Sequence, residues 1–141
     1  MQSAPPISPS PTLREIPSRQ RLWMGRILSG LIIAFMVLDI GGHFAMPGPV
    51  LQAFQKLGMP YRMGLEIAIL GLIATVAYAV PRSAVLGAVM LTGYFGGAIS
   101  IHLRAGSTPF ECVFPAILGL ITWAGIYLRE PLLSRLIPLR R

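Results

Sequence analysis

The chain has 141 residues, of which 54% are hydrophobic and only 12% charged, and its mean hydropathy is +0.67. So apolar a composition excludes an ordinary water-soluble domain and indicates an integral membrane protein, because most of the chain has no polar face to turn toward water. The formal charge of +7 does not indicate a nucleic-acid partner, since the basic residues lie in the tails and between apolar runs, and the single cysteine, Cys112, excludes an intrachain disulfide, a CxxC pair or a cysteine-based zinc cluster.

The N-terminal segment is rich in proline and serine and is followed by four apolar runs. Residues 1–21 contain five prolines and are expected to form a disordered tail, because they cannot bury enough apolar surface to fold. Each run has roughly 17 to 20 residues, the length that crosses about 30 Å of hydrocarbon. The runs cover about residues 27–46, 64–80, 84–102 and 110–128. We therefore predict an all-α four-helix transmembrane bundle in one domain, residues 22–131, followed by a basic tail, residues 132–141.

Local signals mark where the helices begin and end. Proline and glycine in "PGP" end the first run at Pro47, and Pro81 ends the second. Ser83 is the expected N-cap of the third helix, which leaves a tight turn and an antiparallel hairpin. Between the first two runs, "PVLQAFQKLG" has apolar residues at helical spacing, which is typical of a short helix at the membrane interface; an irregular loop is the alternative.

The basic residues predict the orientation of the bundle. With four spans, both termini lie on one side, and nine arginines fall on that side against three basic residues on the other. Positive residues gather in cytoplasmic segments, so we expect both termini in the cytoplasm and residues 47–63 and 103–109 outside.

Ionisable residues gather at the outer end of this predicted bundle. Asp39 and His43 are one helical turn apart near the outer end of the first span, where their side chains can bond directly. Glu66 opens the second span, and His102 and Arg104 close the third at the same height. These five residues form the candidate polar pocket, which we expect between the first and third spans.

The depth of Asp39 makes it the strongest candidate for a functional role. An unpaired carboxylate about 10 Å below the surface would cost several kcal/mol, so it must be neutral, paired or hydrated. Arg104 is the guanidinium whose stem could reach it. An interhelical ion pair that fixes helix packing is an equally good interpretation of these two residues.

Other polar and small residues have structural interpretations beside functional ones. Glu111 follows Thr108 and Pro109 in the pattern of a capping box, which would simply complete a helix start. Gly93 and Gly97 form a small-xxx-small pair, which usually allows close helix packing; a substrate that approaches the backbone is the alternative. Tyr94 is expected to pack, with its hydroxyl bonded to a neighbouring helix.

Two runs resemble the DoxX-like family of small four-helix bacterial membrane proteins. They are "AVLGAVMLTGYFGGAISIHLRAG" and "PFECVFPAILGLITWAGIYLRE", and the resemblance extends from about Arg21 to Pro131. It implies a multi-pass protein of the bacterial cytoplasmic membrane, with relatives that are associated with quinone-linked redox enzymes or membrane oxidoreductase complexes. The family supplies no agreed catalytic residues.

Two functions remain open, and whether the chain is an enzyme is not decided. The first is a membrane subunit of a redox system, in which the pocket binds a quinone or passes a proton between Asp39 and His43, next to a membrane or peripheral redox protein. The second is a non-catalytic assembly module, in which the polar cluster holds the helices in register. His43 and His102 are only a weak signal for haem, and no metal site is predicted. A channel would require a homo-oligomer, because four closely packed helices leave no lumen.

Overall fold

The structure is a computed structural model that describes residues 18–130 and Leu133, and it is all α-helical in this part of the chain. All of the predicted basic tail except Leu133, and most of the predicted N-terminal tail, lie outside the described residues. Five helices follow one another: α1 Arg19–Ala45, α2 Gly48–Lys56, α3 Met63–Ala79, α4 Ala84–Arg104 and α5 Pro109–Arg129.

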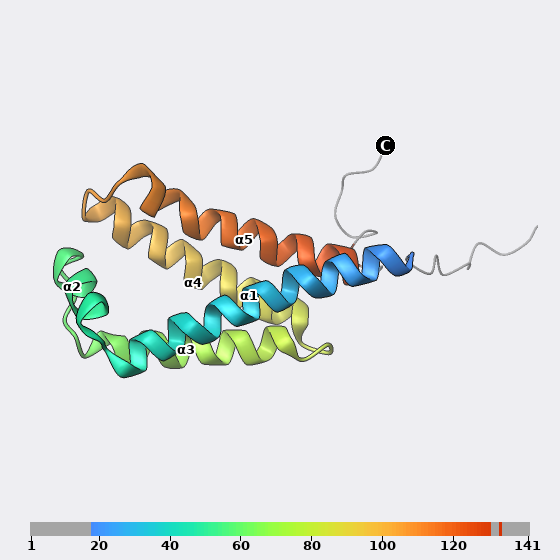
Figure 1. The fold of residues 1–141 in the computed structure, drawn as a ribbon, viewed down its shortest axis with the longest axis horizontal. Coiled ribbons are helices and arrows are strands. Elements are labelled where there is room, and N and C mark those ends of the chain that lie inside the picture. Colours follow the sequence, from blue (N-terminus) through green and yellow to red (C-terminus); the bar gives the residue numbers. More distant parts are fainter. Residues whose placement is uncertain (1–17, 131–132, 134–141) are drawn as a thin grey trace, which may run out of the picture.

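The four long helices form a bundle in which each packs against two others. Helix α1 packs against α3 and α5, and α4 packs against the same two helices, so α1 and α4 lie diagonally across the bundle. Figure 1 shows α2 at one end of the bundle, on the same side as the turn between α4 and α5. The turn between α3 and α4 and the beginning of α1 lie toward the other end. We call the end with α2 the α2 end.

The long helices have the length and surface of membrane spans. Helices α1, α4 and α5 are long and apolar enough to cross a membrane, and α3 is equally apolar but has 17 residues. Large apolar side chains face outward, among them Leu38 at 77% and Leu120 at 72% exposed. Apolar side chains on the outside of a bundle suit lipid rather than water. The chain is therefore a multi-pass membrane protein.

Helix boundaries agree closely with the sequence prediction, except at the beginning of α1. This helix begins at Arg19, eight residues before the predicted span, because the Ser18 hydroxyl accepts a hydrogen bond from the backbone N–H of Arg21 at 3.4 Å and caps it. The prediction of disorder was thus wrong for residues 19–21. The segment after the first span is helical, as α2, rather than an irregular loop.

Two predicted caps have different outcomes. Thr108 and Glu111 form the predicted capping box, with Pro109 in the first turn of α5. Ser83 occupies the N-cap position of α4, but its hydroxyl donates to the carbonyl of Ala77 at 2.9 Å instead of accepting from the new helix. The Ser83 side chain therefore ties the turn back to α3.

A buried hydrogen-bonded cluster joins three helices away from the α2 end. The Tyr78 hydroxyl lies 3.0 Å from Ser29 Oγ of α1 and donates to the backbone carbonyl of Thr122 in α5 at 3.0 Å. All three residues are buried, so water cannot reach their polar groups, and these groups form hydrogen bonds with one another instead. This cluster fixes the bundle far from the polar residues described next.

Candidate functional site

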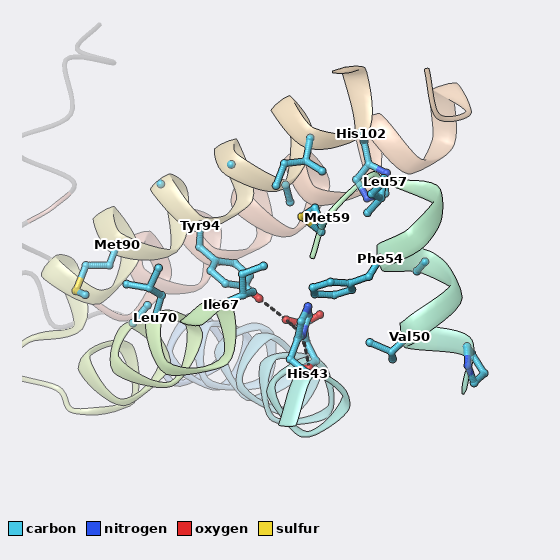
Figure 2. Close-up of a pocket in the computed structure, with 18 residues that line it drawn as sticks. His43, Val50, Phe54, Leu57, Met59, Ile67, Leu70, Met90, Tyr94 and His102 are labelled. Carbon is cyan, nitrogen blue, oxygen red and sulfur yellow. Dashed lines mark hydrogen bonds and ion pairs between the residues drawn. The ribbon is translucent and has the colours of Figure 1, made fainter. Parts of the chain in front are cut away.

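A cavity of about 800 Å³ lies toward the α2 end of the bundle. Four helices contribute to its wall, α1 to α4, whereas α5 contributes no lining residue. Figure 2 shows Phe54 of α2, Ile67 and Leu70 of α3 and Met90 of α4 around it. The wall is mostly apolar, and protein atoms do not enclose the cavity completely.

Three polar side chains come together in the wall of this cavity. The Tyr94 hydroxyl of α4 donates a hydrogen bond to Asp39 Oδ2 of α1 at 2.5 Å. His43 Nδ1 lies 2.7 Å from the backbone oxygen of Asp39 and 3.6 Å from Asp39 Oδ2. We call Asp39, His43 and Tyr94 the polar triad. It joins the two helices that lie diagonally across the bundle.

The contacts of His43 determine its tautomer and orient its ring. A backbone carbonyl only accepts hydrogen bonds, so Nδ1 carries the hydrogen in the bond to the oxygen of Asp39. The ring also packs edge-on against Phe54, with 5.6 Å between the ring centroids. Phe54 itself is only 3% exposed. Helix α2 therefore covers the imidazole from outside the bundle.

The second histidine lies in the same wall. His102 of α4 lines the cavity, and its Nδ1 is 3.1 Å from the hydroxyl of Ser107 in the turn after α4. Because a hydroxyl can donate or accept, this contact does not determine the tautomer of His102. Of the five candidate residues, Asp39, His43 and His102 thus line one cavity.

Arg104 is not the partner of Asp39. Within residues 18–130 no ion pair joins the two side chains, and the carboxylate is bonded to Tyr94 instead. Arg104 lines a smaller cavity of about 420 Å³, next to Gly58 and Ser100. Arg104 follows Gly97 by seven residues and therefore lies on the same side of α4, but it is at the end of the helix. Met59 and Ile101 line both cavities, whereas Arg104 lines only the smaller one.

Glu66 also lies outside the cavity wall. Its side chain is exposed at the beginning of α3, whereas Ile67, Leu70 and Ala74 share the face that lines the cavity. Glu66 precedes Leu70 by four residues, so it lies on the same side of α3 but nearer the beginning of the helix, and it is not among the residues that line the cavity. Two of the five candidate residues, Glu66 and Arg104, are therefore separate from the polar triad.

Gly93 and Gly97 do not bring helices together within this chain. A Cβ atom built at either position meets no heavy atom within 4 Å, and both glycines lie in the cavity wall. The prediction of close packing was wrong for contacts within the chain. Their lack of side chains instead leaves room in the cavity beside Tyr94.

Helix α2 has one polar attachment to the rest of the bundle. Lys56 Nζ donates to both carboxylate oxygens of Glu111, at 3.0 and 3.4 Å, and Glu111 also accepts from the backbone N–H and hydroxyl of Thr108. The capping interpretation of Glu111 is confirmed. The same carboxylate also connects α2 to the beginning of α5, a contact that the sequence did not predict.

Sequence reasoning did not include two residues of this site. Tyr94 was assigned only a packing role with a hydrogen bond to a neighbouring helix. Its hydroxyl does bond another helix, but this helix is α1, which lies diagonally across the bundle, and Asp39 is the acceptor. Its spacing of eight residues from His102 was the signal that both share one helix face. Phe54 could have been found from the apolar spacing within α2.

A model of the DoxX-like family matches residues 27–125, which include α2, α3, α4 and most of α1 and α5. Comparisons with the curated proteins and with the solved structures give no match. The matched range covers more than half of the chain and contains the whole polar triad. On this match, the resemblance noted in the sequence is confirmed, and the multi-pass chain belongs to the DoxX-like family.

Proposed function

We propose that this protein is a small membrane subunit of a redox or quinone-linked system, in which the cavity beside the polar triad binds a lipid-soluble ligand such as a quinone. Its partner would be a membrane or peripheral redox protein. The role of Asp39 and His43 is to hold the polar end of the ligand and to exchange a proton with it. Neither haem nor a metal ion has a part in this proposal.

The single observation that carries the proposal is an apolar cavity with a hydrogen-bonded carboxylate, phenol and imidazole in its wall. Ligand sites of small molecules have this character: walls that are mostly apolar and a few polar groups that orient the ligand. A volume of about 800 Å³ is large enough for a substituted aromatic ring and part of a tail. Ionisable residues within membrane segments are themselves typical of functional sites.

We further propose that the chain lies in the bacterial cytoplasmic membrane with both termini in the cytoplasm. The positive residues support this orientation, since they are concentrated in the tails and the turn between α3 and α4. In this orientation the α2 end, with the cavity, faces the outside.

Filling the cavity tests the ligand without removing the polar triad. Gly97→Phe adds a ring to the cavity wall, where a Cβ atom has free space. The matched control Leu120→Phe adds the same ring to an exposed position of α5, which has no residue in the wall. Each protein is expressed in a quinone-containing bacterial membrane and purified, and its bound lipids are extracted and chromatographed.

The proposal expects quinone or quinol to purify with the wild-type chain and with Leu120→Phe, and at least tenfold less with Gly97→Phe. It also expects Asp39→Asn combined with His43→Ala to reduce respiration-linked quinone turnover in membranes that contain equal amounts of protein. Wild-type protein free of quinone, together with unchanged turnover in the double variant, would exclude this function.

A second candidate, the assembly module, is favoured by the bond between Tyr94 and Asp39. This bond joins α1 to α4, which are not directly packed neighbours. If its role is structural, Asp39→Asn and Tyr94→Phe should lower the amount of folded protein in the membrane, while Gly97→Phe should leave that amount unchanged. Quantitative immunoblotting of membranes distinguishes this result from a loss of ligand at constant protein level.

A further inference from the structure

The hydrogen bonds already made within the polar triad determine what the triad can still offer a ligand. A tyrosine hydroxyl has one hydrogen, and Tyr94 donates it to Asp39 Oδ2. Tyr94 therefore has no hydrogen left for a ligand. An ionised carboxylate carries no hydrogen, so Asp39 in that form can only accept hydrogen bonds.

His43 offers an acceptor as well. Its Nδ1 hydrogen is directed to the backbone oxygen of Asp39, which leaves the second ring nitrogen, Nε2, with a lone pair in the neutral imidazole. Neither Nε2 nor the second carboxylate oxygen, Oδ1, has a hydrogen-bond partner among the described residues. No buried side-chain nitrogen or oxygen atom in this part of the chain lacks a partner. Both atoms must therefore be accessible.

The triad thus presents two accessible acceptors and no free donor; His102, in the same cavity wall, can act as donor or acceptor because its contact with Ser107 does not determine its tautomer. A carbonyl group placed against the triad would find lone pairs facing lone pairs, whereas a hydroxyl group there could donate to the carboxylate or to the imidazole. Ligands that meet unpaired polar groups lose affinity strongly, because those groups give up water without a replacement.

The shape and chemistry of the other walls favour an aromatic ligand. Phe54 and Tyr94 supply aromatic rings, and Met59 and Met90 supply thioethers, whose sulfur atoms contact aromatic rings favourably. Figure 2 shows all four around the cavity, with His43 at one side. A flat ring can lie among these groups with a substituent directed at the triad.

We infer that the cavity selects a membrane-soluble aromatic compound that carries a hydroxyl donor, a hydroquinone or another phenol, over the corresponding quinone. This inference rests on the proposed function and specifies its ligand: the reduced form binds and the oxidised form is discriminated against. The selecting groups are Asp39 and His43, and Tyr94 acts as a positioning residue that occupies Oδ2 and leaves Oδ1 for the ligand.

Three compounds with the same carbon skeleton test the inference. They are tetramethyl-1,4-hydroquinone, its quinone and its dimethyl ether, and each is titrated under anaerobic conditions into the purified full-length chain in lipid nanodiscs. Isothermal calorimetry should give at least tenfold tighter binding of the hydroquinone than of the quinone or the ether, the difference expected for one hydrogen bond to a charged acceptor. The ether separates the effect of the hydroxyl hydrogen from that of ring shape.

A substitution that exchanges an acceptor for a donor gives the second readout. Asp39→Asn replaces one carboxylate oxygen by an NH₂ group, so the preference for hydroquinone should fall to less than threefold while quinone binding is kept or improved. A variant that had merely lost its fold would bind neither compound. Leu120→Ala, an exposed position of α5, serves as the control and should keep the full preference.

The outcomes separate the inference from the function on which it rests. Equal or tighter binding of the quinone by the wild-type chain overturns the inference but leaves a quinone-linked function in place. Binding of none of the three compounds, nor of a decyl-tailed hydroquinone, overturns both. Binding of the decyl compound at least tenfold tighter than the tail-less one identifies a lipid-pool hydroquinone as the source of the ligand; equal binding identifies a free phenol.

Discussion

Gly87 and Gly93 lie six residues apart on α4 but meet different surroundings. A Cβ atom at Gly87 would collide with the backbone of Tyr78 in α3, whereas one at Gly93 would meet no heavy atom within 4 Å. Backbone cannot move aside as a flexible side chain can, so the first position requires glycine and the second does not.

We therefore expect Gly87→Ala to destabilise the protein by about 1–3 kcal/mol, because the added methyl group must push α3 and α4 apart. Gly93→Ala should leave stability unchanged or raise it by about 0.5–1 kcal/mol, because alanine favours the helix. Thermal unfolding in detergent, followed by circular dichroism, measures both. Equal losses in the two variants would contradict the assignment of Gly87 as the close contact.

At the scale of the element, α2 is held differently from the other helices. It is absent from the closely packed helix pairs and is attached by the burial of Phe54 and by the ion pair between Lys56 and Glu111. An exposed ion pair is screened by water and contributes little to stability, while burial of a phenylalanine contributes more. Phe54 should therefore be the main attachment of α2.

Phe54→Ala is expected to release α2 and to speed tryptic cleavage after Lys56 severalfold, because the peptide bond there must leave the helix to enter the protease. Leu51→Ala is the matched control, since Leu51 is on the same helix but 39% exposed, and its cleavage rate should not change. Limited proteolysis in detergent with mass spectrometry gives both rates. If both variants were cleaved at the wild-type rate, Phe54 would not be what holds the helix.

At the scale of the whole molecule, the proposed orientation in the membrane would place the cavity near the outer aqueous phase. The proposal puts α2 outside and the turn at Arg82 in the cytoplasm, following the distribution of positive residues. In a Cys112→Ser background, Gln52→Cys should react with a membrane-impermeant maleimide in intact cells, and Arg82→Cys only after lysis. Both residues are exposed, so reactivity reports the side of the membrane. The opposite labelling pattern would invert the topology.

Much of the fold was predictable because helix boundaries depend on local residues. Pro81 ends α3 and the capping box begins α5, so three of the four spans were located to within two residues. The beginning of α1 was missed, since the cap at Ser18 lies within a proline-rich composition typical of disorder. The sequence left residues 48–56 open between a short helix and an irregular loop. The structure has a helix there, α2, and its Phe54 is buried against His43.

The candidate site was predictable only in its local part. Asp39 and His43 are four residues apart, so one helix brings them together whatever the bundle does. Tyr94 is 55 positions from Asp39 in the sequence. Judged only by position along the bundle axis, Arg104 appeared equally able to reach the Asp39 carboxylate. Height along a helix can be counted from the sequence, but the direction of a side chain toward a particular neighbour cannot.

The sequence by itself determined that this chain crosses a membrane several times and that Asp39 and His43 lie one turn apart on one helix, because hydropathy, helix length and helical spacing are properties of neighbouring residues. Only the tertiary structure decided that Tyr94 bonds Asp39, that Arg104 and Glu66 line no part of the larger cavity, and that Gly93 and Gly97 border this cavity rather than a helix contact within the chain. The physical reason is that rotation and spacing of packed helices follow from the fit of all their surfaces at once, and no single segment contains that information.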